Sequence, residues 1–118
     1  MQFRFQNMEI WQRGAAISAP LFHLADNLEQ RRLRRFAEQL RAAVLSITNN
    51  IAEGSGSTSD AEFANFLNIA RRSVFEVANM LLLFLQQGIC AQAEVASHLA
   101  ELDQQSRMLL AFRRTLKS

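Results

Sequence analysis

The stretch from Gln39 to Gly54, QLRAAVLSITNNIAEG, constrains the fold most, because it carries two different stripes at helical spacing. One stripe is apolar and recurs at steps of three and four, which places it on one face of a helix: Leu40, Val44, Ile47 and Ile51. The other lies about a quarter-turn away and is small, polar and almost uncharged: Gln39, Ala43, Ser46, Asn50 and Glu53. Since polar groups are costly to bury unpaired, we expect a partner surface to supply their hydrogen bonds. The alternative is that Ser46 and Asn50 face solvent.

Length and composition favour a single domain over residues 1–118. A chain of 118 residues with 49% hydrophobic residues can bury a core and is not disordered. It has no run of about eighteen apolar residues, so we expect no membrane span. Its start lacks the pattern of an export signal, and the single cysteine, Cys90, cannot form an internal disulfide. These features favour a cytoplasmic protein.

Two helices are expected in the first half of the chain. Asn7 can cap the first, with Glu9 in its first turn, and Pro20 predicts a kink near Ile17 to Pro20 or a broken helix. We expect a turn at Asp26 to Gln30 and a second helix from about Glu29 to Glu53. The apolar stripe of this second helix extends back to Leu33 and Phe36. The following GSGSTS, Gly54 to Ser59, must break it.

Two further helices are expected in the second half. Ser59 and Glu62 have the spacing of a capping box, which predicts the start of a third helix, and Gly88 ends it. A fourth helix is expected near Ala91 to Leu116. Four helices joined by short turns predict an all-α, up-down-up-down antiparallel four-helix bundle.

The third helix carries features that point to self-association. Its segment Met80 to Leu85, MLLLFL, is apolar on every side, and a helix in a bundle of this size cannot hide all sides in its own core. We therefore expect the bundle to form an oligomer. The helix also has a second polar stripe that could face the first: Asn65, Asn68, Arg72, Glu76 and Asn79.

The chain carries no convincing catalytic or metal-binding set. A bundle that holds two metal ions needs paired Glu and Glu-x-x-His ligands, and neither His23 nor His98 has Glu three positions before it. Cys90 lies near a predicted helix start, which could lower the pKa of its thiol. The alternative is that Cys90 is a small apolar side chain that fills space in the core. We expect a protein that is not an enzyme and has no metal and no cofactor.

The basic residues point to RNA. Of the 13 cations in the chain all but Lys117 are arginines, which suit planar partners such as phosphate. Arginine-rich coding in a GC-rich genome is an alternative explanation. Pairing with Glu29, Glu38 and Glu76 within helices is another. The arginines that we predict to bind nucleic acid are Arg31, Arg34, Arg35, Arg41, Arg71, Arg72, Arg113 and Arg114.

Three segments of the chain match a recurring sequence pattern. The pattern Q-L-R-R-A-x-x-S-I-P-x-N-I-A-E-G is matched by Gln39-Leu40-Arg41, Ala43, Ser46-Ile47 and Asn50 to Gly54. Phe66-Leu67, Ile69-Ala70, Ser73 and Glu76 match a following F-L-x-I-A-x-x-S-x-x-E, and the start, Met8 to Gly14, is similar to a segment with V-W-Q-K-A. In these segments, and over nearly its whole length, the chain resembles a family of four-helix-bundle proteins encoded in intervening sequences of bacterial large-subunit ribosomal RNA. Relatives of this family include the accessory variability proteins of diversity-generating retroelements.

The chain departs from the family pattern at positions that bear on function. Ala42 replaces the second hallmark arginine, Thr48 replaces the proline, Ser57 stands where many members have arginine, and Arg72 occupies a usual glycine. If the family arginines touch RNA, this protein has lost two such positions. The resemblance also implies a homopentamer, to whose interfaces the polar stripes would belong: Gln39, Ser46, Asn50, Glu53, Asn68 and Glu76.

The function that we expect is that of a non-catalytic, oligomeric accessory protein that binds structured RNA. In its sharpest form this is an accessory variability protein, which binds a reverse transcriptase and its template RNA. An intervening-sequence protein that binds ribosomal RNA is the alternative. A protein–protein scaffold, in which the arginines form salt bridges between subunits, is an alternative of another class.

Overall fold

Helices are the regular structure of residues 2–117, the part of the chain that the computed structural model describes. A short 3-10 helix, η1, precedes four α-helices. Their bounds are Arg4–Asn7 for η1, Glu9–Gln30 for α1, Arg34–Ser55 for α2, Asp60–Gln86 for α3 and Gln92–Arg114 for α4. Residues 2–117 contain no strand, so the prediction of an all-α fold is confirmed.

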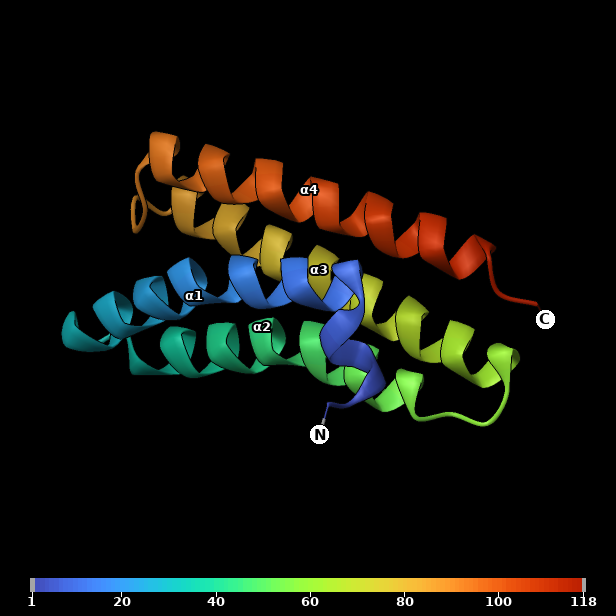
Figure 1. The fold of residues 1–118 in the computed structure, drawn as a ribbon. Coiled ribbons are helices and arrows are strands. Elements are labelled where there is room, and N and C mark those ends of the chain that lie inside the picture. Colours follow the sequence, from blue (N-terminus) through green and yellow to red (C-terminus); the bar gives the residue numbers. More distant parts are fainter. Residues whose placement is uncertain (1, 118) are drawn as a thin grey trace.

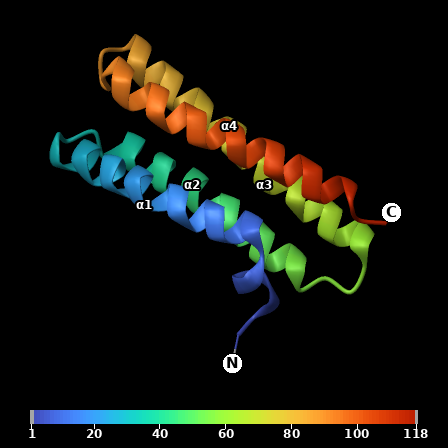
Figure 2. The ribbon, with the colours of Figure 1, turned by 45° about the horizontal axis from the view of Figure 1, so that its top comes forward.

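The four helices form an antiparallel bundle with an up-down-up-down path (Figure 1). The backbone of each helix lies close to that of the next one in the chain, and α4 returns to lie close to α1, whereas the backbones of the diagonal pairs do not come within 8 Å of each other, Cα to Cα, in residues 2–117. Contact between α1 and α4 is the least extensive of the four neighbouring pairs. Figure 2 shows the consequence, two hairpins, α1–α2 and α3–α4, that lie side by side. The longest dimension of the molecule is 44 Å.

The apolar stripe of the Gln39 to Gly54 stretch points into the core, as its spacing predicts. Leu40, Val44 and Ile51 have no exposed surface and Ile47 has almost none. They belong to one core cluster with the buried side chains of the other helices, of which Phe63 of α3 is the largest. Burying each such side chain stabilises the fold by about 1.5–3 kcal/mol, so this stripe contributes most to holding α2 in the bundle.

The beginning of α1 differs from the prediction, and Pro20 does not break the helix. Met8, not Asn7, is the N-cap, without a side-chain cap hydrogen bond, because residues Arg4–Asn7 form η1 instead. Glu9 lies in the first turn, as expected. The helix is continuous through Pro20, which lies exposed on its surface.

The turn between α1 and α2 lies later than predicted. The predicted turn at Asp26 to Gln30 is wrong, because Leu28 is fully buried and the core contact keeps these residues helical. The chain turns instead at Arg31 to Leu33. Arg32 adopts a left-handed conformation, with φ of 66°. The amide of Leu33 donates to the carbonyl of Leu28 at 2.9 Å, which closes the helix end in the way that a glycine usually permits.

Gly54 does not break α2, contrary to the prediction that the helix ends before it. The helix continues to Ser55, and Gly54 is buried against the start of α3. A Cβ atom placed on Gly54 would lie 2.6 Å from Cβ of Phe66 and 2.8 Å from a ring carbon of Phe63. The glycine is therefore needed for close packing of two helices, and the break falls at Gly56 and the residues that follow it.

The predicted ends of α3 are both confirmed. The hydroxyl oxygen of Ser59 accepts a hydrogen bond from the amide of Glu62 at 3.2 Å, as an N-cap should. At the other end Gly88 has φ of 73°, and the amide of Ile89 donates to the carbonyl of Phe84. The fourth helix is slightly shorter than predicted at both ends.

Candidate nucleic-acid interface and apolar groove

The structure does not bring the eight predicted RNA-binding arginines together. Arg31, Arg34 and Arg35 lie at the α1–α2 turn, at one end of the bundle, whereas Arg113 and Arg114 end α4 at the other (Figure 1). The remaining residues lie along the helices between these ends: Arg41, Arg71 and Arg72. A single compact site that uses all of them is therefore excluded.

Four arginines gather at the α1–α2 turn and form the most cationic part of the described chain: Arg31, Arg32, Arg34 and Arg35. We call them the tip arginines. All four are exposed, and the ion pairs present among residues 2–117 involve none of them. A guanidinium nitrogen of Arg31 donates to the carbonyl of Ile89 at 2.9 Å, which joins this turn to the α3–α4 turn. The other three guanidinium groups face solvent and are available to phosphates.

Arg41 is engaged within the bundle. Its two terminal nitrogens lie 2.7 Å from a carboxylate oxygen of Asp26 and 2.6 Å from one of Glu29. The hydrogen bond to Asp26 first, and then that to Glu29, raises the pKa of the Arg41 guanidinium above its usual value. Arg41 thus connects α2 to α1, which makes it a different kind of group from the tip arginines.

Two of the arginines of α3 and of the end of α4 are held by hydrogen bonds to backbone carbonyl groups, and the other two are exposed. The Nε–H of Arg71 donates to the carbonyl of Ser106 at 3.2 Å, and that of Arg113 donates to the carbonyl of Ala64 at 3.1 Å. Arg72 and Arg114 are exposed. The held arginines join α3 to α4, and each still carries a full positive charge at the surface.

The polar stripe of α2 finds part of its hydrogen bonds inside the chain. The hydroxyl groups of Ser46 and Ser73 lie 2.8 Å apart across the α2–α3 contact, and the amide of Asn50 donates to the carbonyl of Ser46 at 2.7 Å. The partner of Ser46 is α3 of the same chain and the partner of Asn50 is Ser46 in α2 itself, so neither a second subunit nor solvent is needed for these bonds. The other predicted stripe residues are exposed: Gln39, Glu53, Asn68 and Glu76.

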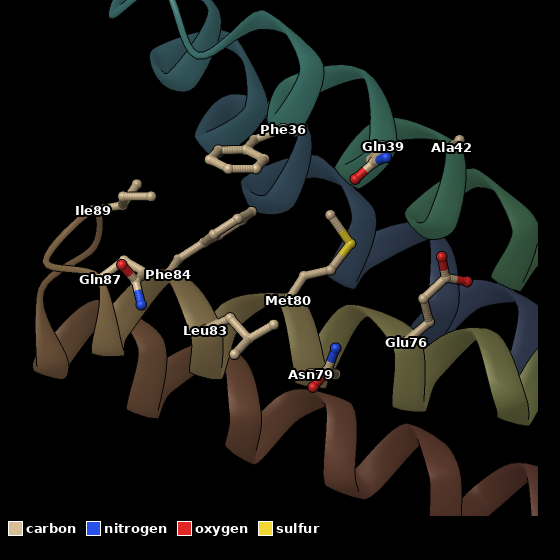
Figure 3. A pocket seen from close by; sticks show the side chains of 10 residues that line it. All are labelled: Phe36, Gln39, Ala42, Glu76, Asn79, Met80, Leu83, Phe84, Gln87 and Ile89. Carbon is tan, nitrogen blue, oxygen red and sulfur yellow. The ribbon is translucent and has the colours of Figure 1, made fainter.

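A groove of about 580 Å³ lies between α2 and α3 near the tip arginines (Figure 3). Its apolar part contains Phe36 and Phe84, whose ring centroids are 5.5 Å apart, together with Met80 and Leu83. Gln39 of α2 and Glu76 of α3 line it further along, as Figure 3 shows. The MLLLFL segment supplies the exposed Leu83, so the prediction that its apolar surface exceeds what the bundle can bury is confirmed.

The remaining features of the described residues concern metal ligands, the cysteine and membrane spans. Residues 2–117 contain no group of three or more His, Cys, Asp or Glu side chains placed to hold a metal ion. Cys90 is buried, and burial together with nearby Glu94 raises the pKa of its thiol, which fits the interpretation as an apolar filler. None of the helices in this part of the chain has the length and apolar character to cross a bilayer.

Residues 6–111 match the family model described as 23S rRNA-intervening sequence protein. The chain belongs to this family. The match spans α1 to α3 and most of α4, so the resemblance noted in the sequence is confirmed. No curated protein and no solved structure matches the chain.

Two surface features of this family member escaped the sequence reasoning. Phe36 extends the apolar stripe of α2, as predicted, yet it is 39% exposed in the α2–α3 groove. Phe75, outside the apolar face of α3, is 56% exposed beside Arg71 and Arg72. The signal for Phe75 was present in the sequence, since it lies four residues after Arg71 and off the apolar face.

Proposed function

We propose that this protein is a non-catalytic RNA-binding protein that acts on 23S ribosomal RNA at or near an intervening sequence. The observation that carries the proposal is the group of tip arginines, which are exposed and outside the ion pairs of residues 2–117. Exposed guanidinium groups on one end of a rigid bundle suit the closely spaced phosphates of folded RNA. The family description supplies the kind of RNA.

We further propose that copies of the chain associate through the apolar surface of α3. Of the seven large apolar side chains that are exposed among residues 2–117, four lie on this helix, and three of these would form the contact: Ile69, Leu82 and Leu83. Such a surface is more than a monomeric bundle of this size usually presents to water. A ring of copies, the homopentamer implied by the resemblance, would present the tip arginines several times and so raise the affinity for RNA.

Two other functions give different outcomes in the same experiment. An accessory variability protein would prefer a retroelement template RNA and would bind a reverse transcriptase. A protein–protein scaffold would assemble and bind neither RNA. The α2–α3 groove favours assembly in all three cases, so RNA binding is the measurement that separates them.

The test is binding of the purified protein to a 23S rRNA fragment with its intervening sequence, measured across a series of salt concentrations. We expect affinity to fall steeply as salt rises, because each neutralised phosphate releases counterions. Replacing Arg34 and Arg35 together by glutamine removes two phosphate contacts. The slope of log affinity against log salt should then become shallower by about 1.4 to 1.8.

The matched control removes the same charge from paired arginines. Arg13 and Arg41 each form ion pairs within the bundle, so glutamine at both positions should leave the salt slope nearly as in the parent protein. An equal decrease of the salt slope in both double variants would mean that the net positive charge of the protein, and not the position of the tip arginines, determines its affinity for RNA. Absence of binding at low salt would overturn the proposal and favour the scaffold.

A further inference from the structure

Phe75 and its arginine neighbours form a surface feature that the tip arginines do not explain. The side chain of Phe75 is 56% exposed in the middle of α3. Exposing a phenyl ring to water is unfavourable. Arg71, one helical turn earlier, places its guanidinium carbon 5.0 Å from the centroid of the ring. Together with Arg72 these residues line a hollow of about 220 Å³. An exposed ring in this setting offers a flat face beside positive charge.

The arginine on the ring is held in place. The Nε–H of Arg71 donates to the carbonyl of Ser106 at 3.2 Å, so α4 fixes the guanidinium over the ring. A platform that is already ordered loses little conformational entropy when a ligand stacks on it. The arrangement therefore has the properties of a preformed binding surface, which a freely rotating surface pair lacks.

The charges around the ring favour an anionic ligand. Arg71 and Arg72 lie beside it, and Asp103 lines the neighbouring hollow between α3 and α4. The carboxylate of Asp103 is paired with Nε of Arg107 at 3.1 Å, so its negative charge is offset. Glu76 lines the groove on the other flank of α3, between α2 and α3. The balance on the side of Phe75 is positive.

We infer that Phe75, Arg71 and Arg72 form a stacking site for an unpaired nucleotide of RNA. A base stacks on the exposed ring or on the guanidinium that covers it, and the adjacent arginine binds the phosphate of the same nucleotide. The inference rests on the proposed RNA binding and adds to it a second, base-contacting site far along α3 from the tip. It assigns recognition of single-stranded RNA to this face and phosphate contacts of structured RNA to the tip.

The test compares Phe75→Leu with the parent protein on two probes, a ten-nucleotide single-stranded RNA with one 2-aminopurine and a fully paired RNA hairpin. Leucine keeps an apolar side chain but removes the flat ring. Affinity for the single strand should fall by about 5- to 150-fold, the range given by loss of one stacked base. The quenching of 2-aminopurine fluorescence on binding should disappear, whereas affinity for the hairpin should stay the same.

The matched control is Leu45→Ala, which changes an exposed apolar side chain of α2 that is 49% exposed and does not line the α2–α3 groove. This variant should leave the affinity for both RNA probes unchanged. Unchanged single-strand affinity and quenching in Phe75→Leu would overturn the inference while leaving the proposed function intact. Failure of the parent protein to bind either RNA would overturn both. A change of oligomeric state in Phe75→Leu, seen by light scattering, would assign the ring to a subunit contact and overturn the stacking site.

Discussion

Arg32 is the residue whose backbone conformation is least suited to its side chain. Its φ of 66° lies in the left-handed region, which costs a non-glycine residue about 1–2 kcal/mol. The equivalent position at the end of α3 is occupied by Gly88, with φ of 73°. The two helix ends thus use the same geometry with different residues, and Arg32 retains a charge at the tip where glycine would be more stable.

Replacing Arg32 by glycine should therefore stabilise the protein by about 0.5–1 kcal/mol. Relief of the left-handed strain is partly offset because glycine gives the unfolded chain more conformations. Thermal or denaturant unfolding measures the change. The reverse substitution, Gly88→Ala, is the control: its Cβ would meet nothing within 4 Å, so the backbone alone should cost about 1 kcal/mol. Destabilisation by Arg32→Gly would mean that the arginine side chain contributes more than its backbone costs.

At the scale of the elements, the end of α2 depends on how closely it approaches α3. Gly54→Ala would place a Cβ within 2.6 Å of Cβ of Phe66. The two helices would have to separate, and we expect a loss of about 1–3 kcal/mol of stability in spite of the better helix propensity of alanine.

Gly56→Ala is the matched control two residues later, since the nearest atom to its Cβ is the Glu53 carbonyl oxygen at 3.4 Å. Denaturant midpoints should be nearly unchanged for Gly56→Ala and clearly lower for Gly54→Ala. Equal midpoints would show that the α2–α3 contact opens at little cost.

The helices and the core could be predicted from the sequence because periodicity reports directly on burial. The stripe from Leu40 to Ile51 and the N-cap at Ser59 follow local rules and were predicted correctly. The turn after α1 was misplaced because Asp26 and Asn27 resemble turn residues, whereas burial of Leu28, a tertiary effect, keeps the helix intact. Gly54 was misread for a similar reason, since its packing partners lie on another helix.

The candidate site could be predicted less well than the fold. Sequence identifies which residues are arginines, but pairing decides which of them are free. Arg41 of α2 forms ion pairs with Asp26 and Glu29 of α1. The sequence pattern of α2 alone does not predict these pairs. Ser46 likewise finds Ser73 only once α2 and α3 pack together. Contacts between helices, which no single helical repeat encodes, therefore separate the free arginines Arg32, Arg34 and Arg35 from the held ones.

At the scale of the whole molecule, the exposed apolar and cationic side chains lie close together. The groove between α2 and α3 lies near the tip arginines, and Phe75 lies beside Arg71 and Arg72. A subunit contact through this groove would therefore lie close to the tip, so assembly should be measured in every variant whose RNA binding is compared.

Leu83→Glu should dissociate the proposed oligomer, because it places a charge in the groove where Leu83 is 47% exposed. Light scattering after size-exclusion chromatography should report a lower mass for this variant. Leu45→Glu is the control, since Leu45 is 49% exposed on α2 and does not line the groove. Dissociation by Leu45→Glu alone would place the subunit contact on a different face, and a monomeric parent protein would overturn the association.

The contact between α1 and α4 has a consequence for how the chain is made. Gln105 is fully buried, and its amide donates to the carbonyl of Ile10 at 2.9 Å, across 95 residues of sequence. At a synthesis rate of about 5–20 residues per second, Ile10 is made roughly 5 to 20 s before Gln105. Each hairpin can form as it emerges from the ribosome. The contact between α1 and α4, however, can form only when synthesis is nearly complete. During that interval the nascent first helix keeps an uncovered flank, where chaperones can bind and misassembly between neighbouring nascent chains can begin.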